Sequence, residues 1–207
     1  MGMTMAQKTR RKDKKIHPRL LRGLYMRQNI QIFCEGATEV GYFSSFKKKT
    51  KAIPGGNALK IVTEAILRKD RDIRPADQYW IVFDKDDTPA TEFDKAVKLA
   101  QANGFQVAWS NQAFELWLIL HFREVSHACH RKKYEEMLRR YLPEYTVSDK
   151  GEEQGKELFA QTWASVKNAI ENAKKGHLSF DARMAPSEME SCTLVYRLIE
   201  VLLKELQ

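Results

Sequence analysis

Acidic side chains follow two of the most apolar segments of the chain. Residues 30–34 are followed directly by Glu35, and Glu39 comes four positions later. Residues 79–83 are followed by residues 84–87, which read Asp-Lys-Asp-Asp. A carboxylate at the end of a buried strand needs a cation or a proton to offset its loss of water. The pattern therefore predicts a cation site, or a shared proton, where the two segments end.

The types of these residues favour a hard divalent ion. Asp84 and Asp86 are separated by one residue, so on an extended segment both can converge on one ion while Lys85 points away. In an α/β sheet ligands bind at the carboxyl ends of the strands, which brings Glu35 to the same edge. Carboxylates without a nearby His or Cys favour Mg²⁺ or Mn²⁺, which most often serve phosphate chemistry. Alternatively, each acid is an ordinary strand-end or cap residue; the joint occurrence of the two motifs favours the metal site.

Strands and helices are predicted to alternate over the first half of the chain. Short β-branched and aromatic runs predict buried strands, and apolar positions three and four apart predict helices. The predicted strands cover residues 30–34, 79–83 and 105–109, and the predicted helices cover 38–49, capped by Thr38, 58–71 and 91–103. This order indicates βαβ units and an α/β fold with a mostly parallel sheet flanked by helices.

Helices dominate the prediction for the second half. The segment SNQAFELWLILHF, which begins at Ser110, predicts a buried helix that is apolar on nearly every face, with Glu115 in its middle. Further helices are predicted at residues 130–142, 153–174 and 187–206. We therefore expect a basic, disordered tail (1–28), an α/β core (29–123) and a helical extension packed on the core (124–207).

Asn111 and Glu115 are four positions apart, which places them on one face of the predicted helix. There they could orient metal-bound water or support the acidic shell. The alternative is that Asn111 caps the helix and that Glu115 pairs with a buried arginine such as Arg123 or Arg183.

Positive charge is concentrated near the N-terminus. The net charge is +8, and residues 1–29 hold nine Lys or Arg against one acid, so the rest of the chain is neutral overall. A basic tail attracts a polyanion because neutralised phosphates release their counterions. Nucleic acid is one predicted partner, and a solvated leader without a specific partner is the alternative. The candidate nucleic-acid-binding residues are Arg10, Arg11, Lys12, Lys14, Lys15 and Lys85.

The cysteines and the apolar runs indicate in which cellular compartment the protein is expected. The chain has three cysteines, which are far apart and form no Cys-x-x-Cys pair. This usage favours a reduced, cytoplasmic interior. No apolar run of signal-peptide length follows the N-terminal charges, and no stretch of about 18 apolar residues predicts a membrane span.

Three motifs together resemble a known family. FCEGATEVGYF, WIVFDKDD and WSNQAFELWLILHF resemble, in this order, the signatures of the RloB family of small bacterial proteins, which are related to Toprim nucleases of the OLD type. The resemblance extends from about residue 20 to the end and includes APSEMESCTLVYRLIE. Gln112 stands where the family usually has proline, and Ala185 where it usually has asparagine.

The resemblance implies a Toprim-like fold and a metal-dependent nuclease that acts on DNA or RNA, with tRNA among the candidate substrates. It further implies a role in antiphage or restriction-linked defence and an ATPase as partner. Catalysis would rest on Glu35, Asp84 and Asp86. Glu39 would join these three in a site for one or two Mg²⁺ or Mn²⁺ ions. The supporting residues would be Gly36, through which phosphate approaches the backbone, Asp87, Asn111 and Glu115.

Two other functions remain open. The first is a Toprim-like module that binds nucleic acid or an ATPase without cutting. The second is a phosphatase of the haloacid-dehalogenase type, because residues 84–88 also fit the Asp-x-Asp-x-Thr loop of that class. That class needs a further acidic pair on a later strand, whereas Asp149 and Asp181 are isolated.

Overall fold

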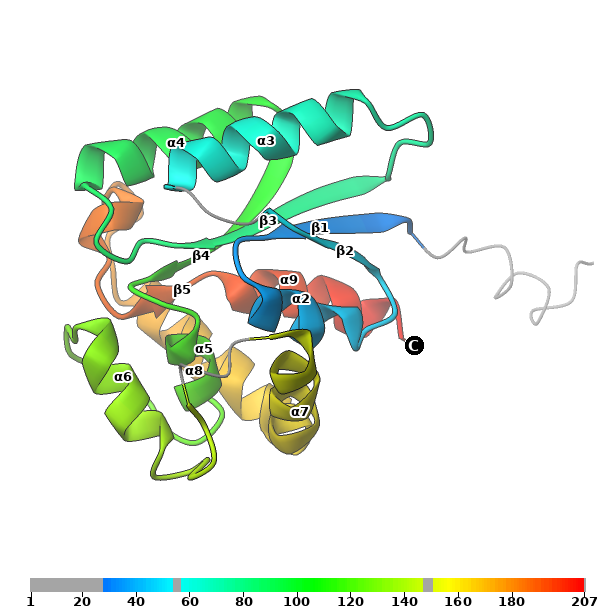
Figure 1. Ribbon diagram of the computed structural model, residues 1–207. Coiled ribbons are helices and arrows are strands. Elements are labelled where there is room, and N and C mark those ends of the chain that lie inside the picture. The colour runs from blue at the N-terminus through cyan, green and yellow to red at the C-terminus, as the bar shows by residue number, and fades with distance from the viewer. Residues whose placement is uncertain (1–27, 54–56, 147–150, 207) are drawn as a thin grey trace, which may run out of the picture.

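The computed structural model describes residues 28–53, 57–146 and 151–206. Its centre is a five-stranded sheet in the order β2-β1-β3-β4-β5 (Figure 1). The first four strands are parallel and β5 is antiparallel. The strands are β1 (Ile30–Cys34), β2 (Lys49–Ala52), β3 (Gln78–Asp84), β4 (Phe105–Asn111) and β5 (Cys192–Thr193).

Helices cover both faces of this sheet. Helices α3 (Ala58–Asp70) and α4 (Ala90–Ala102) lie on one face, and α2 (Ala37–Ser44) and α9 (Val195–Lys204) lie on the other (Figure 1). Burial on both sides explains why β1 and β3 are almost continuously apolar. The predicted α/β fold with a mostly parallel, helix-flanked sheet is confirmed.

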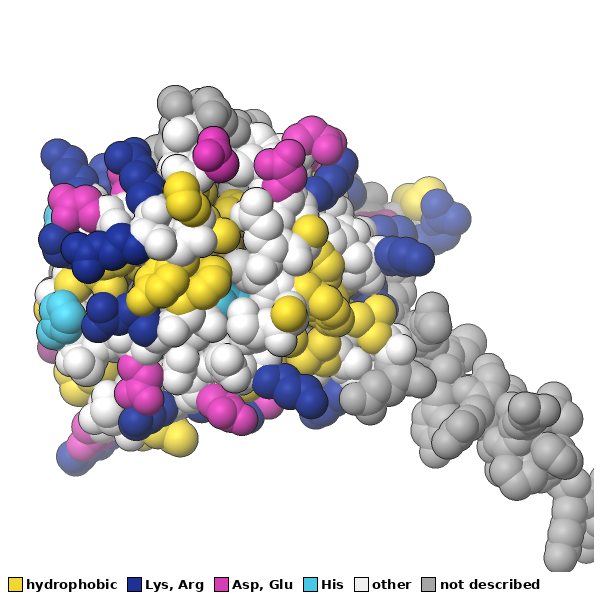
Figure 2. All heavy atoms as spheres, turned by 90° about the horizontal axis from the view of Figure 1, so that it is seen from below, with side chains coloured by type: hydrophobic (Ala, Val, Ile, Leu, Met, Phe, Trp, Pro, Cys, Tyr) yellow, Lys and Arg dark blue, Asp and Glu magenta, His cyan; other side chains and the backbone are white. Residues whose placement is uncertain are grey.

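A further set of helices lies beyond α2 and α9, on the side away from the sheet (Figure 1). These are α5 (Glu115–Ile119), α6 (Arg131–Leu138), α7 (Glu152–Thr162) and α8 (Val166–Leu178). Figure 2 shows this side of the molecule from outside, where apolar side chains lie among basic and acidic ones. No helix in the described part of the chain is long and apolar enough to span a membrane.

The register of the sheet decides where the acids lie. Cys34 pairs with Val82, and Glu35 N donates to the Val82 carbonyl at 3.1 Å. Asp84 is the last residue of β3 and pairs with Ser110 on β4. The chain passes from β1 to β2 on one side, and β3 occupies the other side, so the strand order reverses between β1 and β3. Ligands of open α/β sheets bind at such a reversal.

The predicted helix over residues 38–49 is wrong at both ends. Helix α2 follows Gly36 without a side-chain cap, so Thr38 lies inside it, and it ends at Ser44. Lys49 instead begins β2, where it pairs with Gln31. The strand sequence KTKA is polar because β2 is an edge strand, and lysines on an edge discourage pairing with another chain.

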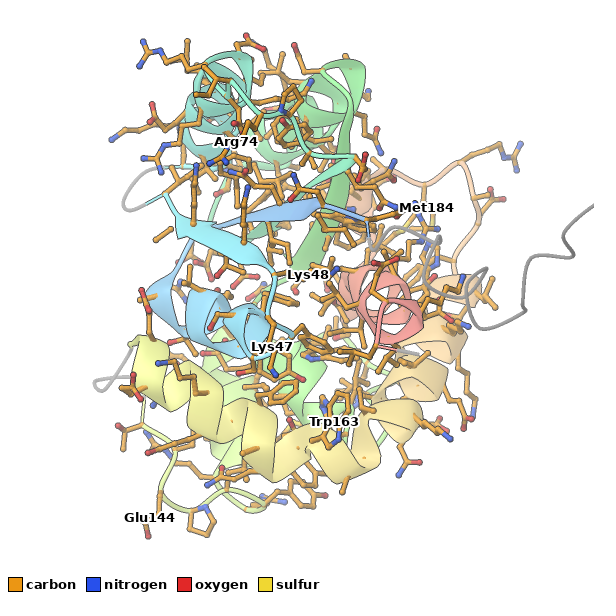
Figure 3. The ribbon with its side chains drawn as sticks, turned by 90° about the vertical axis from the view of Figure 1, so that its right-hand side faces the viewer. Lys47, Lys48, Arg74, Glu144, Trp163 and Met184 are labelled. Carbon is orange, nitrogen blue, oxygen red and sulfur yellow. The ribbon has the colours of Figure 1, made fainter. Side chains whose placement is uncertain are left out.

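Three later helices also differ from the prediction. The helix expected from Ser110 begins at Glu115, because β4 extends to Asn111 and pairs there with β5. The helix expected over 153–174 is broken between α7 and α8 by a 3₁₀ turn at Trp163–Ser165, of which Trp163 is labelled in Figure 3. The helix expected over 187–206 starts later, since a 3₁₀ turn at Pro186–Glu188 and strand β5 precede α9.

Candidate active site

Five carboxylates line one small cavity at the carboxyl edge of the sheet. They come from the ends of β1 and β3, from α2, from the loop after β3 and from α5. The cavity has a volume of about 120 Å³. Its acidic residues are Glu35, Glu39, Asp84, Asp86 and Glu115. The four predicted metal ligands and Glu115 therefore meet in one place.

Asp84 is held by two hydrogen bonds, one that it donates and one that it accepts. Its own N–H donates to Glu35 Oε2 at 3.0 Å, and its Oδ2 accepts from Phe114 N at 2.9 Å. Its second oxygen, Oδ1, is buried and has no hydrogen-bond partner among the described residues. A buried oxygen of this kind is costly unless a proton or a cation satisfies it.

The electrostatics of the cavity indicate an excess of negative charge. Burial, together with the charges of Glu39, Glu35, Asp86 and Glu115, raises the pKa of Asp84 well above its ordinary value. A bound divalent cation would reverse this effect, because it favours the ionised carboxylates around it. The cavity therefore favours either a proton on Asp84 or a cation among these groups.

Gly36 has a steric role beside Glu39. A side chain at position 36 would collide with the Glu39 carboxylate, so the glycine leaves the space that this carboxylate occupies. Glu39 itself is only 9% exposed. The prediction that Gly36 admits a phosphate stays a prediction.

Asp86 and Asp87 bind the same arginine. The backbone of Asp86 has a φ of 44°, and its N–H donates to the Gln112 carbonyl at 2.8 Å. Its Oδ1 lies 2.9 Å from Arg131 Nη1, and Asp87 Oδ2 lies 2.8 Å from Arg131 Nη2. Asp87 does not line the acidic cavity, whereas Asp86 does.

Glu115 belongs to the cavity, and its carboxylate accepts a hydrogen bond from Tyr145 Oη at 2.6 Å. The arginines suggested as its partners bind elsewhere. Arg123 Nε donates to the Glu124 carbonyl, and Arg183 pairs with Asp181 at 2.9 Å. Glu115 is thus held in position by a tyrosine hydroxyl.

Asn111 lies outside the cavity, on the last residue of β4. Its Nδ2 donates to the carbonyls of Ser187 at 3.1 Å and Pro186 at 3.4 Å, which attaches the segment before β5 to the sheet. The predictions that Asn111 shares a helical face with Glu115, or that it caps the helix, are both wrong, because α5 starts after this residue and has no side-chain cap.

A ring of hydrogen bonds joins α2 to α5 beside the cavity. Trp117 Nε1 donates to Tyr42 Oη at 3.1 Å, and Tyr42 Oη lies 3.5 Å from His121 Nε2. The Nδ1 of His121 lies 3.0 Å from the Trp117 carbonyl. Since a carbonyl only accepts, Nδ1 carries the proton and Nε2 accepts from the tyrosine. Residues from two sequence motifs thus fix the helices that carry Glu39 and Glu115.

The donor set fits a hard divalent cation, but it is not preassembled. Mg²⁺ or Mn²⁺ would satisfy five carboxylates and the Asp84 oxygen that has no partner within the described part of the chain. Across residues 28–53, 57–146 and 151–206, however, no three His, Cys, Asp or Glu side chains are grouped closely enough to hold a metal ion. One of the five, Asp86, is paired with Arg131.

The acidic cavity adjoins a larger crevice with basic residues. This crevice has a volume of about 530 Å³ and shares Asp84, Asp86 and Glu115 with the cavity. Around α6 it is lined by Arg131, Lys132, Glu135, Glu136 and Arg139. The sequence analysis missed Arg131, since one arginine in a run of charged helical residues gives no signal of its own.

Of the predicted nucleic-acid-binding residues, Lys85 does not line the acidic cavity or the crevice. Its N–H donates to the Ser110 carbonyl at 2.9 Å. The candidate residues of the tail, Arg10, Arg11, Lys12, Lys14 and Lys15, lie outside the described residues, as does the tail itself up to residue 27.

One protein family matches most of the sequence. The match to the RloB-like proteins covers residues 30–202. The chain belongs to the RloB-like family. In this RloB-like protein the acids of the first two motifs lie at the carboxyl ends of β1 and β3, two of the four parallel strands of the predicted α/β sheet.

Comparison with other proteins adds little. No curated protein matches the sequence of this RloB-like protein. Among solved structures it is similar to the C-terminal region of the OLD protein of Xanthomonas campestris pv. campestris, at 14% sequence identity and a TM-score of 0.32, with 89% of this chain and 100% of that chain covered. A likeness this distant supports no assignment of activity.

Proposed function

We propose that this RloB-like protein is a metal-dependent nuclease that hydrolyses phosphodiester bonds of DNA or RNA. One observation supports the proposal most strongly. A buried Asp84 oxygen, without a hydrogen-bond partner among the described residues, lies at the reversal point of a parallel sheet, where burial and the neighbouring carboxylates raise the pKa of Asp84. A scaffold that only binds has no need to gather carboxylates against their mutual repulsion.

The residues of the cavity have distinct parts in this proposal. Glu35, Glu39, Asp84 and Asp86 would hold Mg²⁺ or Mn²⁺. Such ions supply a reactive water at neutral pH and neutralise charge at the phosphate. The protein contributes position: the Asp84 amide orients Glu35, and the Phe114 amide orients Asp84.

Glu115 has a supporting part. Its carboxylate is held by Tyr145 Oη at 2.6 Å and lines both the acidic cavity and the crevice. From there it can accept a hydrogen bond from a water that enters between the two spaces. This role needs no direct contact with an ion.

A non-catalytic module that binds nucleic acid is the second candidate. It is favoured by the lack of a preassembled metal group among the described residues and by the ion pair between Asp86 and Arg131. The phosphatase reading is weaker, because β4 and β5, which follow Asp84 in the sheet, end in the uncharged residues Asn111 and Thr193.

The family resemblance extends the proposal to the biological setting. It supports a role in antiphage or restriction-linked defence with an ATPase as partner. The basic tail, residues 1–28, would add affinity for nucleic acid through its positive charge.

The proposal is tested by replacing Asp84 with Asn, which keeps the shape but removes a negative ligand. Cleavage of DNA, structured RNA and tRNA is measured with Mg²⁺ and with Mn²⁺, with and without a neighbouring ATPase. We expect cleavage to fall by about 100- to 1,000-fold or more, because positioned charge supplies much of the barrier reduction.

The matched control is Asp70→Asn, which makes the same chemical change at an exposed residue at the end of α3. This variant should cleave the nucleic acids at the same rate as the wild type. A wild-type protein that binds these nucleic acids and cuts none of them under any condition would favour the non-catalytic module.

A further inference from the structure

Arg131 is held at the junction of the acidic cavity and the crevice. It is the first residue of α6, and its backbone N–H donates to Gln112 Oε1 at 2.9 Å. Its guanidinium reaches Asp86 at 2.9 Å and Asp87 at 2.8 Å. The arginine therefore binds both carboxylates of one turn, of which Asp86 is a proposed metal ligand.

We propose that Arg131 is a phosphate-binding residue that is held by Asp86 until Asp86 binds a cation in the acidic cavity. This inference rests on the proposed function and deepens it. In the held state the guanidinium withholds one carboxylate from the cation site. In the released state the same guanidinium faces the crevice, where it binds a phosphate of the nucleic acid.

The contact that holds Arg131 is weak enough to exchange. The side chains of Arg131 and Asp86 are 38% and 35% exposed, so water screens their attraction. A divalent cation among several carboxylates attracts Asp86 more strongly than one exposed guanidinium does. Asp86 is therefore expected to leave Arg131 when a cation is available.

The released arginine has the right chemistry for phosphate. A guanidinium is a planar donor that binds two phosphate oxygens at once, and it remains charged at every physiological pH. Lys132 and Arg139 also line the crevice, and Arg131 is distinguished from them by its contact with Asp86. Phosphate binding and cation binding are thus linked through one side chain.

The charges of the crevice predict whether the cation or the nucleic acid binds first. Its three basic residues are opposed by five acids, namely Asp84, Asp86, Glu115, Glu135 and Glu136. A phosphate is repelled by this excess of negative charge until a cation compensates it. Nucleic acid is therefore expected to enter the crevice after the cation.

The test uses Arg131→Gln, which removes the charge and keeps a hydrogen-bonding group. Mn²⁺ affinity is measured by calorimetry without nucleic acid, and the binding of short fluorescent DNA and RNA oligonucleotides is measured by anisotropy in Mn²⁺. We expect Mn²⁺ to bind several-fold more tightly, because Asp86 is no longer engaged. Oligonucleotides should bind about tenfold more weakly, because a charge-assisted contact is lost.

Two further variants control for charge and geometry. Lys98→Gln removes the same charge at an exposed residue of α4 that does not line the crevice, and it should change neither affinity. Arg131→Lys keeps the charge without the planar fork and should restore part of the oligonucleotide affinity. Thermal melts show whether each variant is folded.

Several results would overturn the inference. If Mn²⁺ binds the Arg131→Gln variant as it binds the wild type, or more weakly, then Arg131 does not withhold Asp86. If oligonucleotide affinity is unchanged in Arg131→Gln, or falls equally in Lys98→Gln, then Arg131 is not the phosphate-binding residue. A wild-type protein that does not bind Mn²⁺ at all would instead contradict the proposed function.

Discussion

At the scale of single residues, His121 shows how the burial of a titratable side chain makes the stability of the protein depend on pH. Its side chain is 2% exposed and closes the ring of hydrogen bonds with Tyr42 and Trp117. Burial lowers the pKa of His121 from 6.5 to about 4, and the hydrogen bond to the Trp117 carbonyl only partly offsets this effect. The folded protein therefore keeps this imidazole neutral, while the unfolded chain takes up a proton near pH 6.5.

The sign of the pH dependence follows from this difference. As the pH falls from 6.5 toward 4, the unfolded chain binds the proton first, so the free energy of unfolding decreases. The loss contributed by His121 amounts to about 3 kcal/mol and levels off below the folded pKa. The free energy of unfolding, measured by urea denaturation across this range, should decline less steeply in His121→Gln than in the wild type.

His127→Gln is the control, because this histidine is exposed. It should show the pH dependence of the wild type. Equal pH slopes for the wild type and His121→Gln would mean that the buried ring does not hold a neutral imidazole.

Of the residues in the candidate site, the strand-end acids were predictable. Glu35 and Asp84 follow apolar runs directly, and the ends of parallel strands converge whatever the details of the loops. Arg131 was not predictable, because it comes from a polar helix far along the chain and meets Asp86 only through the folded geometry. Glu115 was singled out from the sequence and lines the cavity, whereas its tyrosine partner was not foreseen.

At the scale of elements, the contact between α2 and α7 positions the cavity from outside. Gly41 on α2 and Gly155 on α7 face one another closely. A Cβ at Gly155 would collide with the Thr38 carbonyl, and one at Gly41 would collide with the Glu152 carbonyl. The two glycines thus let the helix backbones touch, and α2 carries Glu39 into the cavity.

Gly155→Ala should therefore destabilise the fold and move α2. We expect the free energy of unfolding to fall by about 1–3 kcal/mol, since the colliding atoms belong to backbone that cannot turn away. Because Glu39 lies on α2, Mn²⁺ affinity should decrease as well. Both quantities are measured on the purified variant, by denaturation and by calorimetry.

Gly176→Ala provides a matched control in α8. A Cβ there would meet nothing closer than the Ser191 carbonyl at 4.0 Å, so alanine should be neutral or stabilise the helix by about 0.5–1 kcal/mol. If both variants were equally stable, the close contact of α2 with α7 would be contradicted.

Elements were predictable where their pattern was local. The periodic apolar positions of α3 and α4 gave their bounds to within a residue or two. Strand β2 was missed because its edge position makes it polar, and the extension of β4 was missed because Asn111 pairs with β5, more than 80 residues later. Pairing between distant segments overrides local propensity, which a single sequence does not show.

At the scale of the whole molecule, the fold concentrates negative charge at one point. The strand order reverses between β1 and β3, and the carboxylates of five residues meet there while basic residues of α6 lie beside them. Without a cation this arrangement opposes folding, because burial and mutual repulsion raise the pKa of Asp84. The binding of a cation at this site should therefore change the free energy of unfolding of the whole protein.

Thermal unfolding of the wild type and of Asp84→Asn, with and without Mn²⁺, tests the central claim most directly. We expect Mn²⁺ at 100 times its dissociation constant to stabilise the wild type by about 2.7 kcal/mol, which raises Tm by about 5–10 °C. Without metal, Asp84→Asn should melt at a higher temperature than the wild type, because one repelling charge is gone, and added Mn²⁺ should not shift it. A wild-type Tm that ignores Mn²⁺, or an equal shift in both proteins, would contradict a metal site at Asp84.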